Sequence, residues 1–369
     1  MAVLDDQLKK STRRLVGIAL ILTLIGLVFI YSASSIYALE KFGSAHYFFK
    51  KQLFFLIPSF IAFLFFALMP LDLLKKYAPW LFLGSLGLTL LTFVPYFGIK
   101  VHGSNRWLRL GGIAFQPSEF LKLFLFMYIG FFLEKKQKSI RSFMYGYIPF
   151  LAVLGITFLI LLKQPDFGSV ITIFSTSLIL FFVAEFRMIH LLMTLAFMVP
   201  AVVYLIVAKA YRLNRILIFL NPWSDSQGRG FQIIQSLIAL GSGNFWGLGI
   251  SNSKQKFFYL PMQHTDFIFP IIGEETGFIG SIIMIMLYFL FCFYGLRIAL
   301  CLKNQFAFFT TLGFVVFISL QAVINIMVTA GLLPTKGLGL PFVSYGGTAL
   351  VCLASMIGFI VNSAPSARS

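Results

Sequence analysis

Ten apolar stretches, most of them long enough to cross a lipid bilayer as a helix, follow one another along this 369-residue chain. About 20 apolar residues suffice, because a helix rises about 1.5 Å per residue and the hydrocarbon layer is about 30 Å thick. Hydrophobic residues make up 59% of the chain and charged residues 11%, against about 45–50% and about 25% in soluble domains. The stretches are Leu15–Leu39, Leu53–Met69, Trp80–Ile99, Ser118–Leu133, Tyr145–Leu162, Val170–Phe186, Leu191–Ala208, Phe267–Leu296, Phe306–Ala330 and Thr348–Val361.

This pattern predicts the fold class. The stretches are solidly apolar and lack the alternation of a transmembrane barrel. We therefore expect an all-α integral membrane protein, a single bundle of about ten transmembrane helices. The chain should form one polytopic domain over residues 1–369, with cytoplasmic tails at 1–14 and 362–369. A large extracytoplasmic loop is expected at 209–265, between spans seven and eight.

Charge predicts the orientation. An even number of spans places both termini on one side, and basic clusters at the span ends mark the cytoplasmic side. The first span resembles a signal peptide, but its apolar run continues past Ser32-Ala-Ser34, which favours a retained anchor. The basic clusters that mark the cytoplasmic side are Lys9, Lys10, Arg13 and Arg14, then Lys75 and Lys76, then Lys135, Lys136, Lys138 and Arg141.

Many basic residues remain on the opposite side, so the net charge of +17 does not follow from orientation alone. Either these residues are retained for an anionic ligand, or they anchor helices at the interface by snorkelling. Both alternatives stay open for each of them. They are Lys50, Lys51, Arg106, Arg109, Arg212, Arg215, Lys254, Lys256 and Lys336.

The most polar sequences stand where apolar stretches begin and end. A charged group costs about 2.5–3.5 kcal/mol at the centre of a membrane helix, so it is usually kept for function. Asp266, at the mouth of the eighth span, is the strongest candidate, although a capping or ion-pairing role is the alternative. Glu274 and Glu275 follow about 12–14 Å further along the helix and should point about 100° apart. The alternative for both is buried pairing, with Lys163, Arg106 or Lys122 as partners.

The long outer segment has two further features. Phe231–Leu240 predicts a helix lying in the membrane interface. Gly241–Gly249 is too rich in glycine for a helix interior and could bring backbone N–H groups against an anion. It is no nucleotide-binding fingerprint, because the spacing is wrong and no strand is predicted before it. The three cysteines show no metal-binding spacing.

Short sequences along the chain together resemble one family, in the family's order and over most of the length. They are Gly103–Trp107, Phe115–Glu119 with Lys122, Gln164–Gly168, Gly228–Gln232, Gly241–Asn244, Tyr259–Pro261, His264–Phe269, Gly273–Glu275, Leu333–Gly337 and Ser344–Gly347. The chain resembles the SEDS family (shape, elongation, division and sporulation). Gly273 and Thr335-Lys336 make it more similar to the cell-division branch than to the elongation branch.

The resemblance implies a peptidoglycan glycosyltransferase that polymerises lipid II outside the bacterial cytoplasmic membrane, at the division septum. Asp266 corresponds to the family's essential aspartate, which is expected to help deprotonate the acceptor GlcNAc 4-hydroxyl while undecaprenyl pyrophosphate leaves. A divalent cation, magnesium or manganese, could bridge the pyrophosphate oxygens. Residues expected to bind substrate are Arg106, Glu119, Lys122, Asp166, Arg212, Arg215, Lys254, His264, Thr265, Lys336 and Ser344.

The expected partners are lipid II, undecaprenyl-linked glycan, the membrane, a class B penicillin-binding transpeptidase and other divisome membrane proteins, with no nucleic acid. One departure from the family is Met262-Gln263, where its members commonly carry a glutamate. Three alternatives remain: a lipid II flippase, a non-catalytic scaffold and an elongation-type polymerase. Intramembrane carboxylates such as Glu274 and Asp166 would suit a translocation path.

Overall fold

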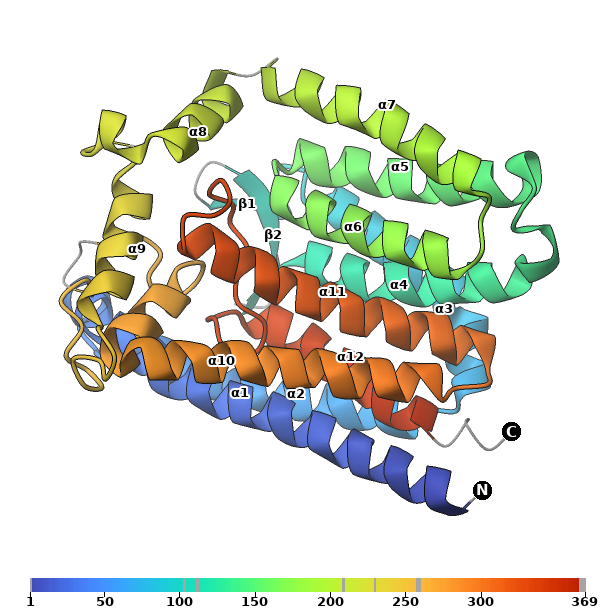
Figure 1. The fold of residues 1–369 in the computed structure, drawn as a ribbon, viewed down its shortest axis with the longest axis horizontal. Coiled ribbons are helices and arrows are strands. Elements are labelled where there is room, and N and C mark those ends of the chain that lie inside the picture. The colour runs from blue at the N-terminus through green and yellow to red at the C-terminus, as the bar shows by residue number, and fades with distance from the viewer. Residues whose placement is uncertain are drawn as a thin grey trace.

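The computed structural model describes residues 2–101, 104–110, 113–207, 210–228, 230–256 and 260–364. Long helices run side by side along one axis, and both termini lie at the same end (Figure 1). Each predicted apolar stretch falls on a helix, which confirms an α-helical multi-pass membrane protein. The helices are α1 (Ala2–Phe42), α2 (Tyr47–Leu68), α3 (Leu71–Leu91), α4 (Pro117–Lys135), α5 (Ile148–Lys163), α6 (Phe167–Val183), α7 (Met188–Val207), α10 (Ile268–Leu300), α11 (Gln305–Thr329) and α12 (Gly347–Ser363).

The third predicted span was placed too late. Trp80–Ile99 was expected to be helical, but α3 begins at Leu71 and ends at Leu91. Pro95 explains the early end, because a proline disfavours helix for itself and for the residue before it. The apolar residues after Leu91 instead lead into a small sheet that the prediction missed. It is antiparallel, in the order β1 (Gly98–Val101), β2 (Ser104–Leu110) and β3 (Ile113–Phe115).

The outer segment between α7 and α10 is more helical than expected. The helix predicted at Phe231–Leu240 is confirmed as α9 (Phe231–Ser242). Two unpredicted elements precede it, α8 (Ala210–Leu220) and the short 3-10 helix η3 (Pro222–Asp225). These elements lie together at the end of the bundle opposite the termini (Figure 1).

Helix α11 runs through the middle of the bundle and packs against α4, α6 and α10 (Figure 1). Phe126 of α4 and Phe317 of α11 are buried, with ring centroids 5.2 Å apart. Close approach of these two helices depends on Gly130, because a Cβ there would collide with Thr310 Oγ1. Small residues serve this purpose at membrane helix interfaces, where van der Waals packing drives association.

Helix α10 is broken at Gly277, whose φ of 71° and ψ of −165° are not helical. The break leaves backbone groups without helical partners, and the glycine-rich segment after α9 satisfies them. The bonds run from Leu248 N to Glu274 O (3.0 Å), from Gly249 N to Glu275 O (3.0 Å) and from Phe278 N to Asn244 O (2.8 Å). The prediction that these loop N–H groups face an anion is therefore wrong for Leu248 and Gly249.

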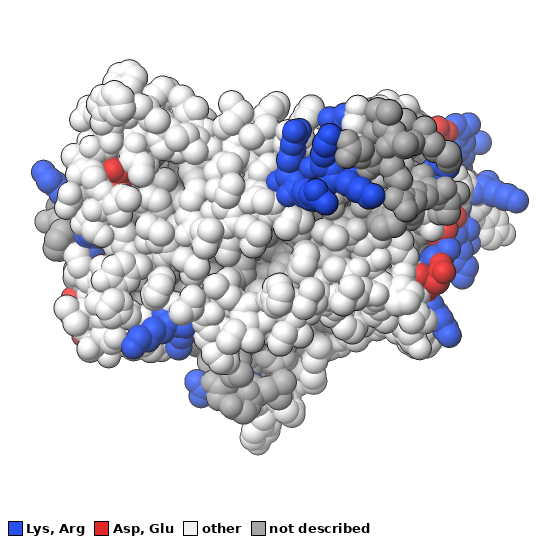
Figure 2. Space-filling model, turned by 90° about the horizontal axis from the view of Figure 1, so that it is seen from below, with Lys and Arg blue, Asp and Glu red and all other residues white. Residues whose placement is uncertain are grey.

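Charged side chains are unevenly spread over the face shown in Figure 2. A dense group of Lys and Arg lies at the upper edge, right of the centre, and a smaller group lies at the lower left, while most of the surface between them is white. An uncharged surface of this kind suits a hydrocarbon layer, where a charge is costly.

Gly277 tests the interlock between α10 and the outer segment. We expect Gly277→Ala to lower the melting temperature, because the positive φ alone costs about 1–2 kcal/mol. The new Cβ would also collide with the backbone of Gly247 and Phe245. Gly87→Ala is the matched control, since Gly87 lies in α3 with nothing within 4 Å of the added Cβ. Equal melting temperatures for the two variants in the same detergent would contradict a structural role for the break at Gly277.

Candidate active site

A cavity of about 980 Å³ opens among helix ends on the side of the bundle away from the two termini (Figure 1). The small sheet forms one wall, and α2, α4, the segment ahead of α10 and the segment between α11 and α12 form the others. It is large enough for a drug-sized ligand, for which pockets of about 300–1,000 Å³ are usual. Its polar and charged lining includes Lys51, Arg106, Arg109, Gln116, Glu119, Lys122, Asp166, Gln263, His264, Thr265, Asp266, Gln321, Ser344 and Thr348.

Asp266 lies in this wall, two residues before α10 begins at Ile268. Among the described residues, no ion pair involves its carboxylate, so the closed pairing considered from the sequence is not found. A Cβ built on Gly337 would lie 3.1 Å from Asp266 Oδ2, so the carboxylate packs directly against this glycine. Burial raises the pKa of Asp266 to about 6, with Arg106 opposing the shift and Asp166 adding to it. A carboxylate with such a pKa can exchange protons near neutral pH.

The backbone around Asp266 is held by hydrogen bonds to three consecutive carbonyl groups, those of residues 264, 265 and 266. Tyr345 N donates to His264 O at 3.0 Å, and Ser344 Oγ donates to Thr265 O at 2.5 Å. The third bond runs from Asn325 Nδ2 of α11 to Asp266 O, at 2.8 Å. The peptide chain that carries the carboxylate therefore has little freedom to shift.

Ser344 was predicted to bind substrate, and it does line the cavity. Its hydroxyl is engaged inside the protein, because it also accepts a hydrogen bond from Leu340 N at 2.7 Å. This arrangement explains Ser344 as a brace of the segment that carries Asp266.

His264 is buried among aromatic rings. Its ring centroid lies 4.3 Å from that of Phe48, 5.8 Å from Tyr37 and 5.9 Å from Tyr345. Burial lowers the pKa of His264 to about 4, so the ring is neutral at physiological pH. A neutral ring of this kind shapes the wall of the cavity and can hydrogen-bond a ligand there.

Glu119 and Lys122, one turn apart at the start of α4, form an ion pair of 2.6 Å at the cavity. The Lys122 side chain is only 3% exposed and lies over the ring of Phe317. Both were predicted to bind substrate, and both line the same cavity as Asp266. Pro117 and Glu119 lie in the first turn of α4.

Asp166 and Arg106 both form hydrogen bonds that stabilise the turn before α6 and the start of that helix. Asp166 caps α6, accepting from Ser169 N at 3.2 Å and from Ser169 Oγ at 2.8 Å. Arg106, on β2, donates to Gln164 O and Pro165 O, both at 2.8 Å. Both side chains therefore line the cavity while fixing its wall.

Two further cations that were predicted to bind substrate, Lys336 and Lys254, are described by the structure and do not line the cavity. Lys336 lies 5.7 Å over the ring of Phe167, and burial lowers its pKa to about 8. Lys254 is exposed in the outer segment. The side chains of Arg212 and Arg215 fall outside the described part of the chain.

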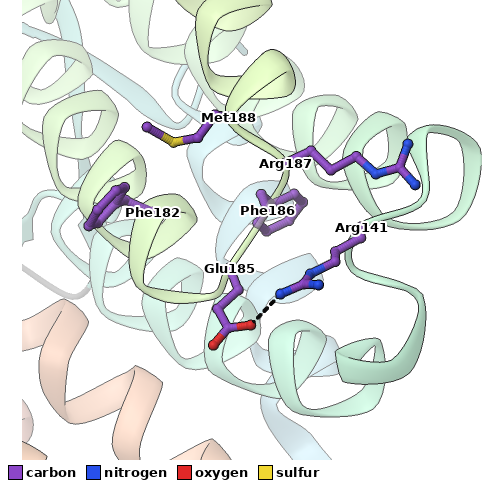
Figure 3. Close-up of a pocket in the computed structure, with 6 residues that line it drawn as sticks. All are labelled: Arg141, Phe182, Glu185, Phe186, Arg187 and Met188. Atoms are coloured by element: carbon purple, nitrogen blue, oxygen red, sulfur yellow. Dashed lines mark hydrogen bonds and ion pairs between the residues drawn. The ribbon is translucent and has the colours of Figure 1, made fainter.

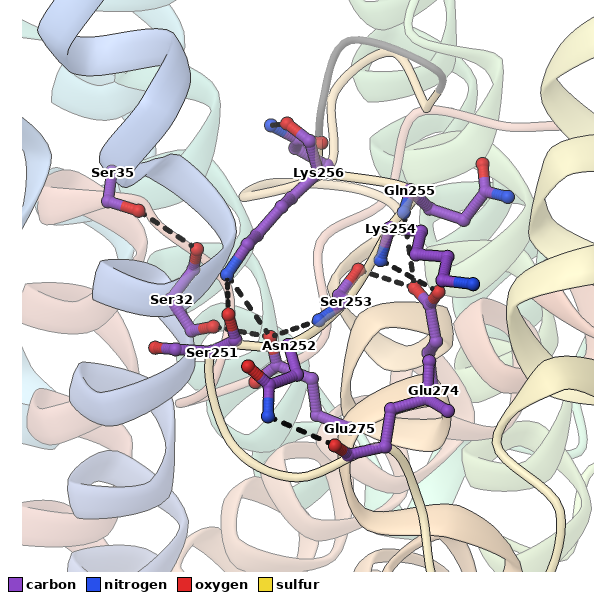
Figure 4. A network of polar contacts seen from close by, with 12 residues as sticks. Ser32, Ser35, Ser251, Asn252, Ser253, Lys254, Gln255, Lys256, Glu274 and Glu275 are labelled. Carbon is purple, nitrogen blue, oxygen red and sulfur yellow. Dashed lines mark hydrogen bonds and ion pairs between the residues drawn. The ribbon is translucent and has the colours of Figure 1, made fainter.

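Glu274 and Glu275 anchor the outer segment, and their predicted partners were wrong (Figure 4). Glu274 accepts from Lys254 N at 2.9 Å, from Gln255 N at 3.4 Å and from Ser253 Oγ. Glu275 accepts from Ser32 Oγ of α1 at 2.6 Å and from Ser253 N at 3.4 Å, with Lys256 Nζ 3.9 Å away. Although the glutamates point apart, Ser253 binds both, because residues 251–256 wrap around the break in α10.

The described residues contain no group of three His, Cys, Asp or Glu side chains that could hold a metal ion. A divalent cation bound here would need oxygen ligands from its substrate, as magnesium often has. Its involvement stays a prediction.

Residues 12–369 match the model of the FtsW, RodA and SpoVE family, described as cell cycle proteins. The chain belongs to the FtsW/RodA/SpoVE family. This match covers nearly the whole polypeptide, so the family extends over the bundle and the cavity together.

Curated relatives agree with this assignment. The chain is 44% identical over 341 residues to the probable peptidoglycan glycosyltransferase FtsW of Trichlorobacter lovleyi, covering 92% of this chain and 90% of the relative. It is 39% identical over 348 residues to stage V sporulation protein E of Bacillus subtilis, covering 94% and 95%.

Solved structures share the fold. One chain, from a structure described as "Structural coordination of polymerization and crosslinking by a peptidoglycan synthase complex", has a TM-score of 0.78 and 27% identity, covering 96% of this chain and 97% of its own. The rod shape determining protein RodA of Thermus thermophilus has a TM-score of 0.71 and 23% identity, with the same coverage. The second likeness concerns the fold alone.

A depression at the opposite end of the bundle is a weaker candidate. It lies at the turn between α6 and α7 and is lined by Arg141, Phe182, Glu185, Phe186, Arg187 and Met188 (Figure 3). Its ion pair, Arg141 to Glu185 at 2.7 Å, is formed by side chains 66% and 75% exposed. Such exposed pairs are screened by water and contribute little to stability.

The raised pKa of Asp266 predicts a pH-dependent cost to stability. Its ordinary value is 3.8 and its folded value about 6, so protonation favours the folded state, and this contribution is lost as the pH rises through about 6. We expect Asp266→Asn to stabilise the protein at pH 8, by on the order of 1–3 kcal/mol, and by clearly less at pH 4.5, because the contribution is complete only below the ordinary pKa of 3.8.

Melting temperatures in detergent at the two pH values check this. Glu40→Gln, at an exposed site on α1, is the matched control and should change stability equally little at both. A loss of stability in Asp266→Asn at pH 8 would mean that the carboxylate has an ionic partner after all.

Proposed function

We propose that this protein is a peptidoglycan glycosyltransferase that polymerises lipid II at the outer face of the cytoplasmic membrane during cell division. The observation that carries the proposal is the carboxylate of Asp266, which faces a large cavity without an ion-pair partner among the described residues. The names of the relatives support the same activity.

The chemistry requires a base beside an alcohol. The acceptor GlcNAc 4-hydroxyl attacks the anomeric carbon of the lipid-linked donor, the bond to the pyrophosphate oxygen breaks, and undecaprenyl pyrophosphate leaves. Asp266 takes the hydroxyl proton as the new glycosidic bond forms. A base is most effective when its pKa lies near the working pH, and the raised pKa of Asp266 brings it closer to that range.

The leaving pyrophosphate needs positive charge. Lys51, Arg106, Arg109 and Lys122 all line the cavity. Preorganised donors of this kind stabilise charge that develops in a transition state. Lys122 shares its charge with Glu119, and Arg106 has part of its guanidinium bound to backbone. Lys51 donates to the Tyr47 hydroxyl at 2.6 Å, a neutral partner that does not pair its charge. Lys51 and Arg109 are therefore the cations of this lining whose charge is best placed to take a phosphate group.

The polyprenyl tail needs access from lipid. Phe54 and Phe55 of α2 line the cavity, and Phe54 is 56% exposed. Ile57, Phe60 and Ile61 continue the exposed apolar face of α2. We infer that the tail lies along this face while its head group enters the cavity.

Translocation is a weaker alternative, because the carboxylates that suggested it have other roles. Asp166 caps α6. Glu274 binds the backbone of the outer segment. Neither is placed to carry charge across the membrane.

The proposal extends to location and partners. With both termini at one end of the bundle (Figure 1), we place that end in the cytoplasm and the cavity outside. We propose that the protein works at the septum with a class B penicillin-binding transpeptidase and other divisome membrane proteins. A similar structure that belongs to a peptidoglycan synthase complex supports a transpeptidase partner.

Reconstitution with lipid II and a cognate transpeptidase tests the activity. We expect glycan strands from the wild type and a loss of about 100-fold or more in Asp266→Ala, because a general base contributes about 10²- to 10⁴-fold. Strand length and amount can be read on gels after labelling the product.

Glu185→Ala, which removes the exposed ion pair at the other end, should retain wild-type polymerisation. Strands from Asp266→Ala at the wild-type rate would contradict the assigned base. Lipid II movement without strands, surviving Asp266→Ala, would support the flippase.

A further inference from the structure

Asn325 stands out because it is polar, buried in the middle helix and absent from the cavity lining. It lies on α11 and is 2% exposed. Its side-chain nitrogen makes two hydrogen bonds, to Asp266 O at 2.8 Å and to Leu338 O at 2.5 Å. One amide group thus joins the backbone of the proposed base to the segment that contains Gly337.

The orientation of this amide is fixed by its partners. Both partners are backbone carbonyls, which can only accept, so the NH₂ group must face them. The other end, Asn325 Oδ1, is buried with no hydrogen-bond partner among the described residues. A buried acceptor without a partner lowers stability. An apolar residue of similar size would avoid that cost but could not donate to the two carbonyls. The two hydrogen bonds that Asn325 donates therefore offset the cost of its unpaired Oδ1.

What Asn325 holds is the contact between Asp266 and Gly337. The Asp266 carboxylate packs against Gly337, with Oδ2 3.1 Å from where a Cβ would be. Leu338, the next residue, is the second carbonyl that Asn325 binds. Because the amide binds both Asp266 O and Leu338 O, it fixes the distance between their two segments, at the place where the Asp266 carboxylate packs against Gly337.

We propose that Asn325 is a positioning residue for the glycosyl transfer: it fixes the direction of the Asp266 carboxylate by tying Asp266 O and Leu338 O together. It touches no substrate and acts only through Asp266. The inference rests on the proposed function, since it assigns Asn325 to the same site. A base displaced by about 1 Å loses rate by up to about 100-fold, so this bond affects turnover more than binding.

The test compares Asn325→Leu with Asn325→Asp, both in the full chain reconstituted with the transpeptidase and lipid II. Leu removes both donors at similar volume, and Asp keeps the shape but replaces the NH₂ group by oxygen. We expect kcat per folded molecule to fall by about 10- to 100-fold in whichever variants fold, with KM for lipid II within about twofold. In Asn325→Leu the acidic limb of the pH profile should also move to lower pH, because a freed Asp266 gains contact with water.

Ser236→Ala is the matched control. Ser236 of α9 is fully buried and donates to Thr329 O at 2.5 Å. Thr329 lies one turn after Asn325 on α11, so Ser236→Ala removes a similar hydrogen bond to the same helix. It should lower the melting temperature without changing kcat or the pH profile. A variant of Asn325 that is less stable but keeps wild-type kcat, KM and pH profile per folded molecule would overturn the proposal.

Failure of the proposed function gives a different result. If the wild type makes no strands, or Asp266→Ala makes as many, the polymerase assignment itself is wrong. If the wild type polymerises and Asp266→Ala does not, while Asn325→Leu and Asn325→Asp match the wild type, only the role of Asn325 is wrong.

Discussion

In a membrane protein, every backbone polar group that water cannot reach must find a partner within the protein. This constraint organises the outer half of the structure. The break in α10 at Gly277 frees backbone groups, and residues 244–249 supply their partners. The carbonyls of residues 264–266 are likewise satisfied by Tyr345, Ser344 and Asn325. These bonds hold the segment after α9 against α10, and they hold the wall of the cavity that carries Asp266.

Within this frame, the Asp266 carboxylate is the exception, because its backbone is held while its charge has no ion-pair partner among the described residues. The neighbouring acidic groups show the ordinary alternative. Glu119 is paired with Lys122, and Glu274 binds backbone N–H groups. A buried charge that is left without such partners lowers stability. Proteins accept this kind of cost at functional sites, and the role proposed for Asp266 accounts for it here.

Much of the fold could be predicted from the sequence, because long apolar runs have few solutions in a bilayer. The helices followed directly, and so did α9, whose pattern is amphipathic. The end of α3 was placed too late because the prediction rested on the apolar composition of the stretch and left out the effect of Pro95 on the helix. The small sheet was missed because its short strands lie between turns and carry no long periodic signal.

The site was predicted less completely. Asp266, Glu119, Lys122, Asp166 and His264 were identified, and the structure gathers them at one cavity. The partners of Glu274 and Glu275 could not be predicted, because they are mostly backbone groups of a segment distant in sequence. Asn325 was overlooked, although a signal existed: Gln321, Asn325 and Thr329 recur every four residues along an otherwise apolar helix. Such a polar stripe on one face predicts contacts with non-helical backbone.

Catalysis as proposed here depends on an ionised Asp266 carboxylate accepting a proton from the acceptor sugar, in a place where burial has raised its pKa. The pH dependence of kcat/KM for lipid II polymerisation by the reconstituted wild type tests this most directly, because it reports the pKa of the essential base in the free enzyme. We expect an acidic limb with its midpoint near pH 6. A rate that stays constant down to pH 4.5, or that rises as the pH falls, would contradict the assignment of Asp266 as the base.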